Sequence, residues 1–114
     1  MVKSIQKGKD GELELAHFLQ DHGFNEARRG RQYSGLEGKD VVGLPGIHSE
    51  CKRVEQLNIL KAMKQSIKDS KIDELPTVMH RKNREEWLVT MRLEDWLLLY
   101  KGYLAELENR NIEK

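Results

Sequence analysis

Four residues of this sequence stand out for the chemistry they could perform together: Glu12, Asp40, Glu50 and Lys52. Hydrolysis of a phosphodiester requires neutralisation of negative charge in the transition state and a source of hydroxide near neutral pH. Clustered carboxylates that hold Mg²⁺ or Mn²⁺ meet both needs, because hard oxygen ligands suit these hard cations. The residue types therefore point to metal-dependent phosphodiester hydrolysis, provided that the fold brings them together.

Each residue has an expected role in such a site. Asp40 and Glu50 would bind one or two Mg²⁺ or Mn²⁺ ions directly, joined by the backbone carbonyl of Cys51. Lys52 would orient or help deprotonate the attacking water, and Glu12 would complete the metal shell or fix a metal-bound water. Two structural alternatives stay open. Glu50 and Lys52 could be an ion pair on an exposed edge strand, and Glu12 could be a first-turn acid that favours the helix dipole.

The N-terminal element that must position Glu12 is a predicted helix over Asp10–His22. Apolar residues such as Leu15 and Leu19 recur there at helical spacing, and Gly23 follows as a C-terminal cap. Glu12 falls on the side of Leu15 and Leu19, so we expect it to project from the core-facing side near the start of the helix.

A hairpin is predicted to position the other three residues. Phe24–Arg29 could be a strand, and the polar, glycine-rich stretch Gly30–Gly38 reads as a loop. Lys39–Leu44 and Ile47–Glu55 read as two strands joined by a Pro-Gly turn at residues 45–46.

Strand periodicity assigns the side chains of the second arm to two faces. Glu50 and Lys52 share one face with His48, and Cys51 points to the other. His48 could touch the site from this face, but we interpret it as a surface histidine, and Cys51 as a small buried hydrophobe.

The remaining chain is predicted to form a basic helix, a second hairpin and a long final helix. Asn58–Lys71 has apolar residues at helical spacing (Ile59, Leu60, Met63 and Ile67) and lysines on the remaining surface. Residues 76–80 and 87–91 are β-prone runs separated by a polar turn. The final helix has an apolar stripe whose expected role is core packing, and three further residues leave room for a dimer contact. The stripe is Leu93, Trp96, Leu97, Tyr100, Leu104 and Leu107, and the further residues are Leu98, Leu99 and Tyr103.

Length and composition predict one domain over residues 1–114. The chain carries 20 Lys and Arg against 19 Asp and Glu, one cysteine, and no apolar run near the roughly 18 residues that cross a bilayer. We therefore expect a cytoplasmic protein with no membrane partner. Basic residues outnumber acidic ones between residues 28 and 84 and are outnumbered on either side. This asymmetry is compatible with nucleic-acid binding, although it is also common in small domains.

The spacing D-x9-E-C-K, from Asp40 to Lys52, resembles the motif of the PD-(D/E)xK nucleases. KGKDGELELAHFLQDHGF, from Lys7 to Phe24, is similar to the opening helix of archaeal-type Holliday junction resolvases, including the lysine-glycine pair before a catalytic glutamate. Arg28, Ser34-Gly35, the LPTV segment at residues 75–78 and the strand at Trp87 also match that arrangement, and Lys39 stands where the motif has proline. The resemblance covers roughly residues 7–92.

The resemblance implies a restriction-endonuclease-like α/β fold with a central mixed β-sheet flanked by helices, to which the apolar periodicity adds a long C-terminal helix. It also implies a Mg²⁺-dependent endonuclease that acts as a homodimer, makes paired nicks in four-way DNA junctions and serves recombination and repair. The compact chain suggests a phage or mobile-element version in a bacterial or archaeal host. Expected DNA contacts are Lys7, Arg28, Arg29, Arg31, Ser34, Lys39, Lys61, Lys64, Gln65 and Lys68.

Two other functions remain open. A nuclease of the same fold could act on flaps, ends or duplex DNA. A non-catalytic DNA-binding module could retain the fold while Asp40, Glu50 and Lys52 are dispensable.

Overall fold

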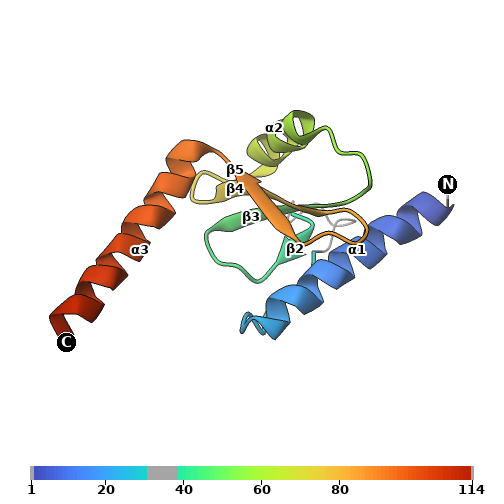
Figure 1. Cartoon of the computed structure of the whole chain (residues 1–114). Coiled ribbons are helices and arrows are strands. Elements are labelled where there is room, and N and C mark those ends of the chain that lie inside the picture. The colour runs from blue at the N-terminus through green and yellow to red at the C-terminus, as the bar shows by residue number, and fades with distance from the viewer. Residues whose placement is uncertain (1, 31–38, 114) are drawn as a thin grey trace.

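The computed structural model describes residues 2–30 and 39–113, with side chains for residues 8–30 and 39–111. The predictions for Lys7, Arg31 and Ser34 lie outside the described side chains. Along the described chain the elements are α1 (Val2–Asp21), β1 (Arg28–Arg29), β2 (Val41–Val42), β3 (Ile47–Arg53), α2 (Ile59–Asp69), β4 (Leu75–Arg81), β5 (Leu88–Met91) and α3 (Leu93–Glu113) (Figure 1).

The five strands form one mixed sheet in the order β1-β2-β3-β4-β5. β3 and β4 are parallel, and the other neighbouring pairs are antiparallel. A parallel pair requires a crossover connection, which α2 supplies between β3 and β4. The predicted α/β class is confirmed at this level: a mixed sheet, flanking helices and a long C-terminal helix.

The β2–β3 hairpin forms where Pro-Gly was expected, with shorter arms than predicted. Val41 pairs with Ser49, and this register places Asp40 opposite Glu50. Gly43 has a φ of +104°, and a Cβ on it would lie 2.4 Å from the Glu26 carbonyl oxygen. Only glycine fits this close approach between the hairpin and the chain before β1.

α1 covers one face of the sheet. Leu15 and Ala16 pack there with Val41, and Cys51 joins this cluster from β3. Cys51 therefore lies on the face opposite Glu50, as predicted, and is partly buried there. The helix itself begins at Val2 and not at Asp10. Leu19, Met79 and Trp87 complete the cluster.

Close packing and ion pairs fix α1 on the sheet. A Cβ on Gly11 would lie 2.5 Å from Arg53 Cβ, so glycine lets the helix approach β3 closely. Glu14 then accepts a hydrogen bond from Arg53 Nε at 2.9 Å and pairs with Arg81 on β4. This side chain ties the helix carrying Glu12 to both central strands.

α2 covers the opposite face, where Ala62 and Met63 pack on Val78. Ser66 Oγ donates a hydrogen bond to the Thr77 carbonyl at 2.8 Å. The prediction that the apolar residues at helical spacing form the buried side of this helix was partly wrong. Leu60 is 72% exposed and Ile67 is also exposed, because the small residues 62 and 66 allow the helix to approach β4 closely. Asn58 accepts a hydrogen bond from the Lys61 N–H at 3.1 Å and caps the helix.

α3 projects away from the sheet and the other two helices (Figure 1). Its first turn is fixed by buried Asp95, which accepts a hydrogen bond from Arg92 Nε at 3.0 Å. The prediction that its apolar stripe packs on the core was wrong. α1 and α2 already cover the sheet, and α3 exposes eight large apolar side chains: Leu93, Trp96, Leu97, Leu98, Leu99, Tyr100, Tyr103 and Leu104.

Candidate active site

Asp40, Glu50 and Lys52 lie on the sheet face that α2 covers. In-register pairing places Glu50 beside Val78, which packs under α2, and Asp40 is opposite Glu50 across the hairpin. Lys52 follows two residues after Glu50 on the same strand and so points to the same side. The strand register therefore places these three predicted site residues on one face of the sheet.

Asp40 is held by the strand that carries the other two residues. The Cys51 N–H donates a hydrogen bond to Asp40 Oδ2 at 2.8 Å, and the Asp40 N–H donates one to the Ser49 carbonyl at 3.1 Å. The Asp40 carbonyl accepts a further hydrogen bond from Gly30. The carboxylate therefore has a fixed position beside the backbone of β3.

Negative charge accumulates around Asp40. Burial, together with the nearby carboxylates of Glu50 and Glu12, raises its pKa from 3.8 to about 7. The Cys51 hydrogen bond and the Lys52 ammonium lower the pKa, but they do not balance the increase. A carboxyl group with a raised pKa beside two others is typical of a site that receives a cation or handles protons.

Glu12 lies in the middle of α1 and is 8% exposed. It accepts a hydrogen bond from Arg29 Nε on β1 at 2.5 Å. Because α1 has no acidic residue in its first turn, the alternative reading of Glu12 as a first-turn acid is wrong. From α1, the charge of Glu12 contributes to raising the pKa of Asp40. Arg29, which was predicted to contact DNA, binds Glu12 instead.

Glu50 has a buried partner, because His48 Nε2 lies 3.0 Å from Glu50 Oε1. His48 is fully buried and Glu50 is 5% exposed. The interpretation of His48 as a surface histidine was wrong. The register pairs His48 with Pro76 of β4, and the Thr77 hydroxyl donates a hydrogen bond to the His48 carbonyl at 2.8 Å. β4 and the adjoining chain therefore enclose the imidazole.

Glu74 continues this buried polar chain, since its Oε1 lies 3.9 Å from His48 Nδ1. Burial raises the pKa of Glu74, but the hydrogen bonds from Lys39 and the Lys71 N–H more than reverse this, so the net pKa is lowered. Lys39, predicted to contact DNA, thus binds Glu74 and also donates to the Ile47 carbonyl at 3.4 Å.

The carboxylates offer the oxygen donors that Mg²⁺ and Mn²⁺ prefer. In the arrangement described for residues 2–30 and 39–113, no three His, Cys, Asp or Glu side chains are grouped to hold a metal ion. Glu50 is hydrogen-bonded to His48, and Glu12 to Arg29. The Cys51 thiol lies on the α1 face, where burial raises its pKa, so only its backbone carbonyl could join a metal site.

The expected DNA-contacting residues divide into two groups. Lys61, Lys64 and Lys68 are exposed on α2, and Arg28 is exposed at the edge strand β1. Arg29 and Lys39 are instead engaged by Glu12 and Glu74, as described above. Gln65, predicted as a DNA contact, is exposed on α2 and donates a hydrogen bond to Asp69 Oδ2 at 2.5 Å.

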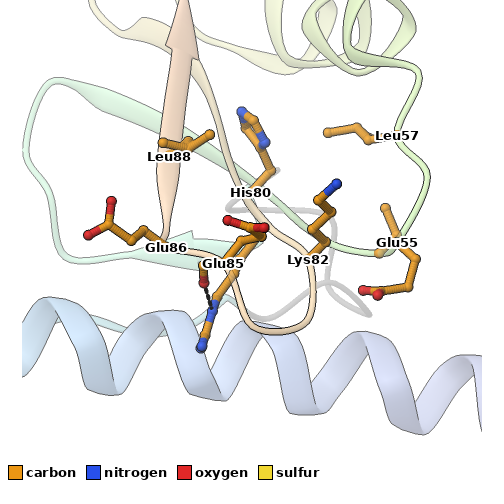
Figure 2. Close-up of a pocket in the computed structure, with 9 residues that line it drawn as sticks. Glu55, Leu57, His80, Lys82, Glu85, Glu86 and Leu88 are labelled. Carbon is orange, nitrogen blue, oxygen red and sulfur yellow. Dashed lines mark hydrogen bonds between the residues drawn. The ribbon is translucent and has the colours of Figure 1, made fainter.

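A hollow of about 500 Å³ lies beyond the C-terminal ends of β3 and β4. Figure 2 shows His80, Lys82, Glu55, Glu85 and other side chains around it. His80 pairs in register with Lys52, so the hollow begins one strand away from the candidate site. Its lining mixes three acidic with two basic residues, a composition that does not favour a polyanion over a neutral ligand.

His48 and Glu74 are the site residues that sequence reasoning missed or misjudged. The alternation of β3 placed His48 on the face of Glu50, which was the available signal. Glu74 lies 24 residues from Glu50 in sequence, and only the parallel pairing of β3 with β4 brings it to His48.

Comparison of the chain with protein-family models, curated proteins and solved structures found no match. No helix in the described part of the chain is long and apolar enough to cross a membrane.

Proposed function

We propose that this protein is a divalent-metal-dependent DNA endonuclease of the PD-(D/E)xK type with a restriction-endonuclease-like fold. The observation that carries the proposal is the placement of Asp40, Glu50 and Lys52 on one sheet face, with Glu12 close enough to raise the pKa of Asp40. Burying several carboxylates together is costly without a compensating cation. The order of elements also agrees with the fold that the resemblance implies: a helix, three antiparallel strands, a crossover helix and a parallel strand.

Mg²⁺ or Mn²⁺ fits the chemistry of this donor set. Asp40, Glu50 and the Cys51 carbonyl are the groups that would hold it, and Glu12 would act from α1. The metal would supply charge neutralisation and an acidified water. The Cys51 N–H holds the Asp40 carboxylate in place, and His48 holds that of Glu50. Lys52 provides the positive charge for the developing phosphorane and for orienting water.

The basic helix α2 supports a nucleic-acid substrate. Lys61, Lys64 and Lys68 are exposed on the helix that covers the sheet face of the candidate site. DNA phosphates bound by these lysines would lie on the same side of the molecule as Asp40 and Glu50.

Four-way junctions are the substrate that we propose, with paired nicks made by a homodimer. The exposed apolar side chains of α3 favour a dimer, which the cutting of two strands requires. Flaps, ends or duplex DNA are the second candidate substrates, and a DNA-binding module without catalysis is the third reading. We also propose that the protein acts in the cytoplasm of a bacterial or archaeal host, as a phage-encoded or host protein.

The test is cleavage of a labelled four-way junction beside linear duplex and flap DNA, with Mg²⁺, Mn²⁺ or EDTA. Asp40→Asn removes the central carboxylate, and Asp73→Asn is the matched control because Asp73 is exposed before β4. We expect metal-dependent cleavage that is lost in Asp40→Asn and kept in Asp73→Asn.

The pattern of cuts separates the substrates. Symmetric cuts confined to the junction support a resolvase, and cuts mainly in the flap or duplex keep the nuclease but change its substrate. DNA binding without cleavage in either metal would refute the catalytic proposal and favour the binding module.

A further inference from the structure

α3 presents an apolar surface that is large for a soluble protein. Eight large apolar side chains between Leu93 and Leu104 are each 38% to 69% exposed. At about 150–250 Å² for each large apolar side chain, the fractions for all of these residues except Leu98 and Leu99, which lie on the other side of the helix, amount to roughly 600 Å², somewhat less than the roughly 800 Å² that one partner contributes to a standard interface. Exposed apolar area of this size marks an interaction site.

The charge of α3 limits what can cover this surface. Acidic side chains outnumber basic ones along the helix, and Glu94 is 78% exposed. A negative helix is repelled by DNA phosphates and by anionic lipid surfaces. A protein surface is therefore the favoured occupant, and the helix must offer that surface complementary charge as well as apolar contact.

The spacing on α3 is complementary to a second copy of itself. Leu93, Leu97, Tyr100 and Leu104 are alternately four and three residues apart, which is the spacing of a two-helix coiled-coil seam. In an antiparallel pair, Leu93 packs against Leu104 of the second copy, and Leu97 against Tyr100 of the second copy. Four such layers form across one twofold axis.

The flanking residues fit the same antiparallel register. Glu94 of each copy falls opposite Lys101 of the other, because these two positions border the seam on the same side of the helix. On the other side of the seam, Trp96 falls opposite Tyr103 of the second copy. A parallel pair would lose both Glu94–Lys101 matches.

We propose that the α3 segment Leu93–Leu104 is a homodimerisation surface on which two copies pack antiparallel, with Glu94 of each copy paired to Lys101 of the other. Each dimer contains this charge pair twice. The inference deepens the homodimer of the proposed function by naming its surface and arrangement, and it is tested separately because association is measured without DNA or metal.

The test is a charge-reversal cycle read by sedimentation velocity over a concentration series. Glu94→Lys and Lys101→Glu each place like charges opposite one another twice. We expect each variant alone to raise the dimer Kd by roughly tenfold or more. An equimolar mixture of the two variants, and the double variant Glu94→Lys/Lys101→Glu, should both recover wild-type association.

Two further variants separate the interface from general effects. Glu108→Lys makes the same charge change beyond the paired segment and should leave the dimer Kd unchanged. Leu97→Asp should make the protein monomeric while its far-UV circular dichroism stays the same, because the side chain is 42% exposed within one copy.

Several results would overturn the proposal. These are a monomeric wild type throughout the series, dissociation by Glu108→Lys as strong as by Glu94→Lys, or failure of the mixture and the double variant to recover. Dissociation by Leu97→Asp without any effect of the charge variants would show a different arrangement of the helices. Loss of DNA cleavage alone would bear only on the proposed function.

Discussion

The face of β2 and β3 buries carboxylates, whereas α3 exposes leucines and aromatic rings. Glu50 is 5% exposed, and burial together with the nearby carboxylates raises the pKa of Asp40 to about 7. On α3, Leu93 is 69% exposed and Tyr103 is 55% exposed. Both arrangements reverse the usual distribution of polar and apolar groups, and both cost free energy in an isolated chain.

The two regions differ in what would relieve that cost. The buried carboxylates around Asp40 are relieved by positive charge, in the form of a cation or protons. Exposed apolar side chains are relieved by another apolar surface. Local departures from folding rules tend to mark functional sites, and the two regions are the ones that we propose for chemistry and for association.

The largest expected effect concerns the chemistry of the first region. Lys52→Met should lower the single-turnover cleavage rate by about 10²–10³-fold, because a charge aimed at the transition state is lost. DNA affinity should change little. The control Lys61→Met, on exposed α2, should weaken DNA binding and leave the rate at saturating enzyme unchanged. Equal rate loss in both variants would mean that Lys52 acts only by binding DNA.

Removing one buried carboxylate should stabilise the metal-free protein. The unfolded Asp40 ionises near pH 3.8, whereas the folded one stays protonated until about pH 7. The folded state therefore holds more protons in this window, and its stability falls as pH rises through it. Asp40→Asn should remove this dependence and raise the unfolding free energy at pH 8 by about 2–4 kcal/mol.

Urea unfolding at pH 5 and pH 8 measures this effect. Adding Mn²⁺ at pH 8 should stabilise the wild type more than Asp40→Asn, because the substitution removes the central carboxylate and leaves only Glu50 and Glu12. A wild type that is equally stable at both pH values would show that Asp40 does not bear the cost, and the comparison with α3 would then fail.

The sequence predicted the elements better than their environments. Alternation along β3 correctly separated Cys51 from Glu50, because strand geometry is local. The same reasoning could not tell that His48 is enclosed, since its cover comes from β4. It also failed for α3, because an apolar stripe at helical spacing looks the same whether it packs on its own core or on another surface.

His48 offers a smaller and more specific test of the buried region. A glutamine amide nitrogen can occupy the place of imidazole Nε2, whereas asparagine is too short to reach Glu50 from that backbone position. His48→Gln should therefore keep the orientation of Glu50. His48→Asn should lose it and destabilise the protein by about 1–3 kcal/mol.

The readout for positioning is the Mg²⁺ concentration that gives half-maximal cleavage. We expect it to rise several-fold in His48→Asn and to stay near wild type in His48→Gln. If the two variants behave alike in this assay while differing in stability, His48 is a structural residue only.

The smallest effects belong to the exposed lysines, which lie in neither of the two unusual regions. Lys64 and Lys68 are solvated on α2, so their removal should cost little stability. Each of Lys64→Ala and Lys68→Ala should lower the slope of log affinity against log salt concentration by about 1, because one phosphate contact is lost. The control Arg110→Ala, on acidic α3 beyond the paired segment, should leave that slope unchanged. A lowered slope in the control, with no change in the α2 variants, would indicate that DNA binds at α3 and not at α2. The proposed assignment of α3 to association would then be wrong.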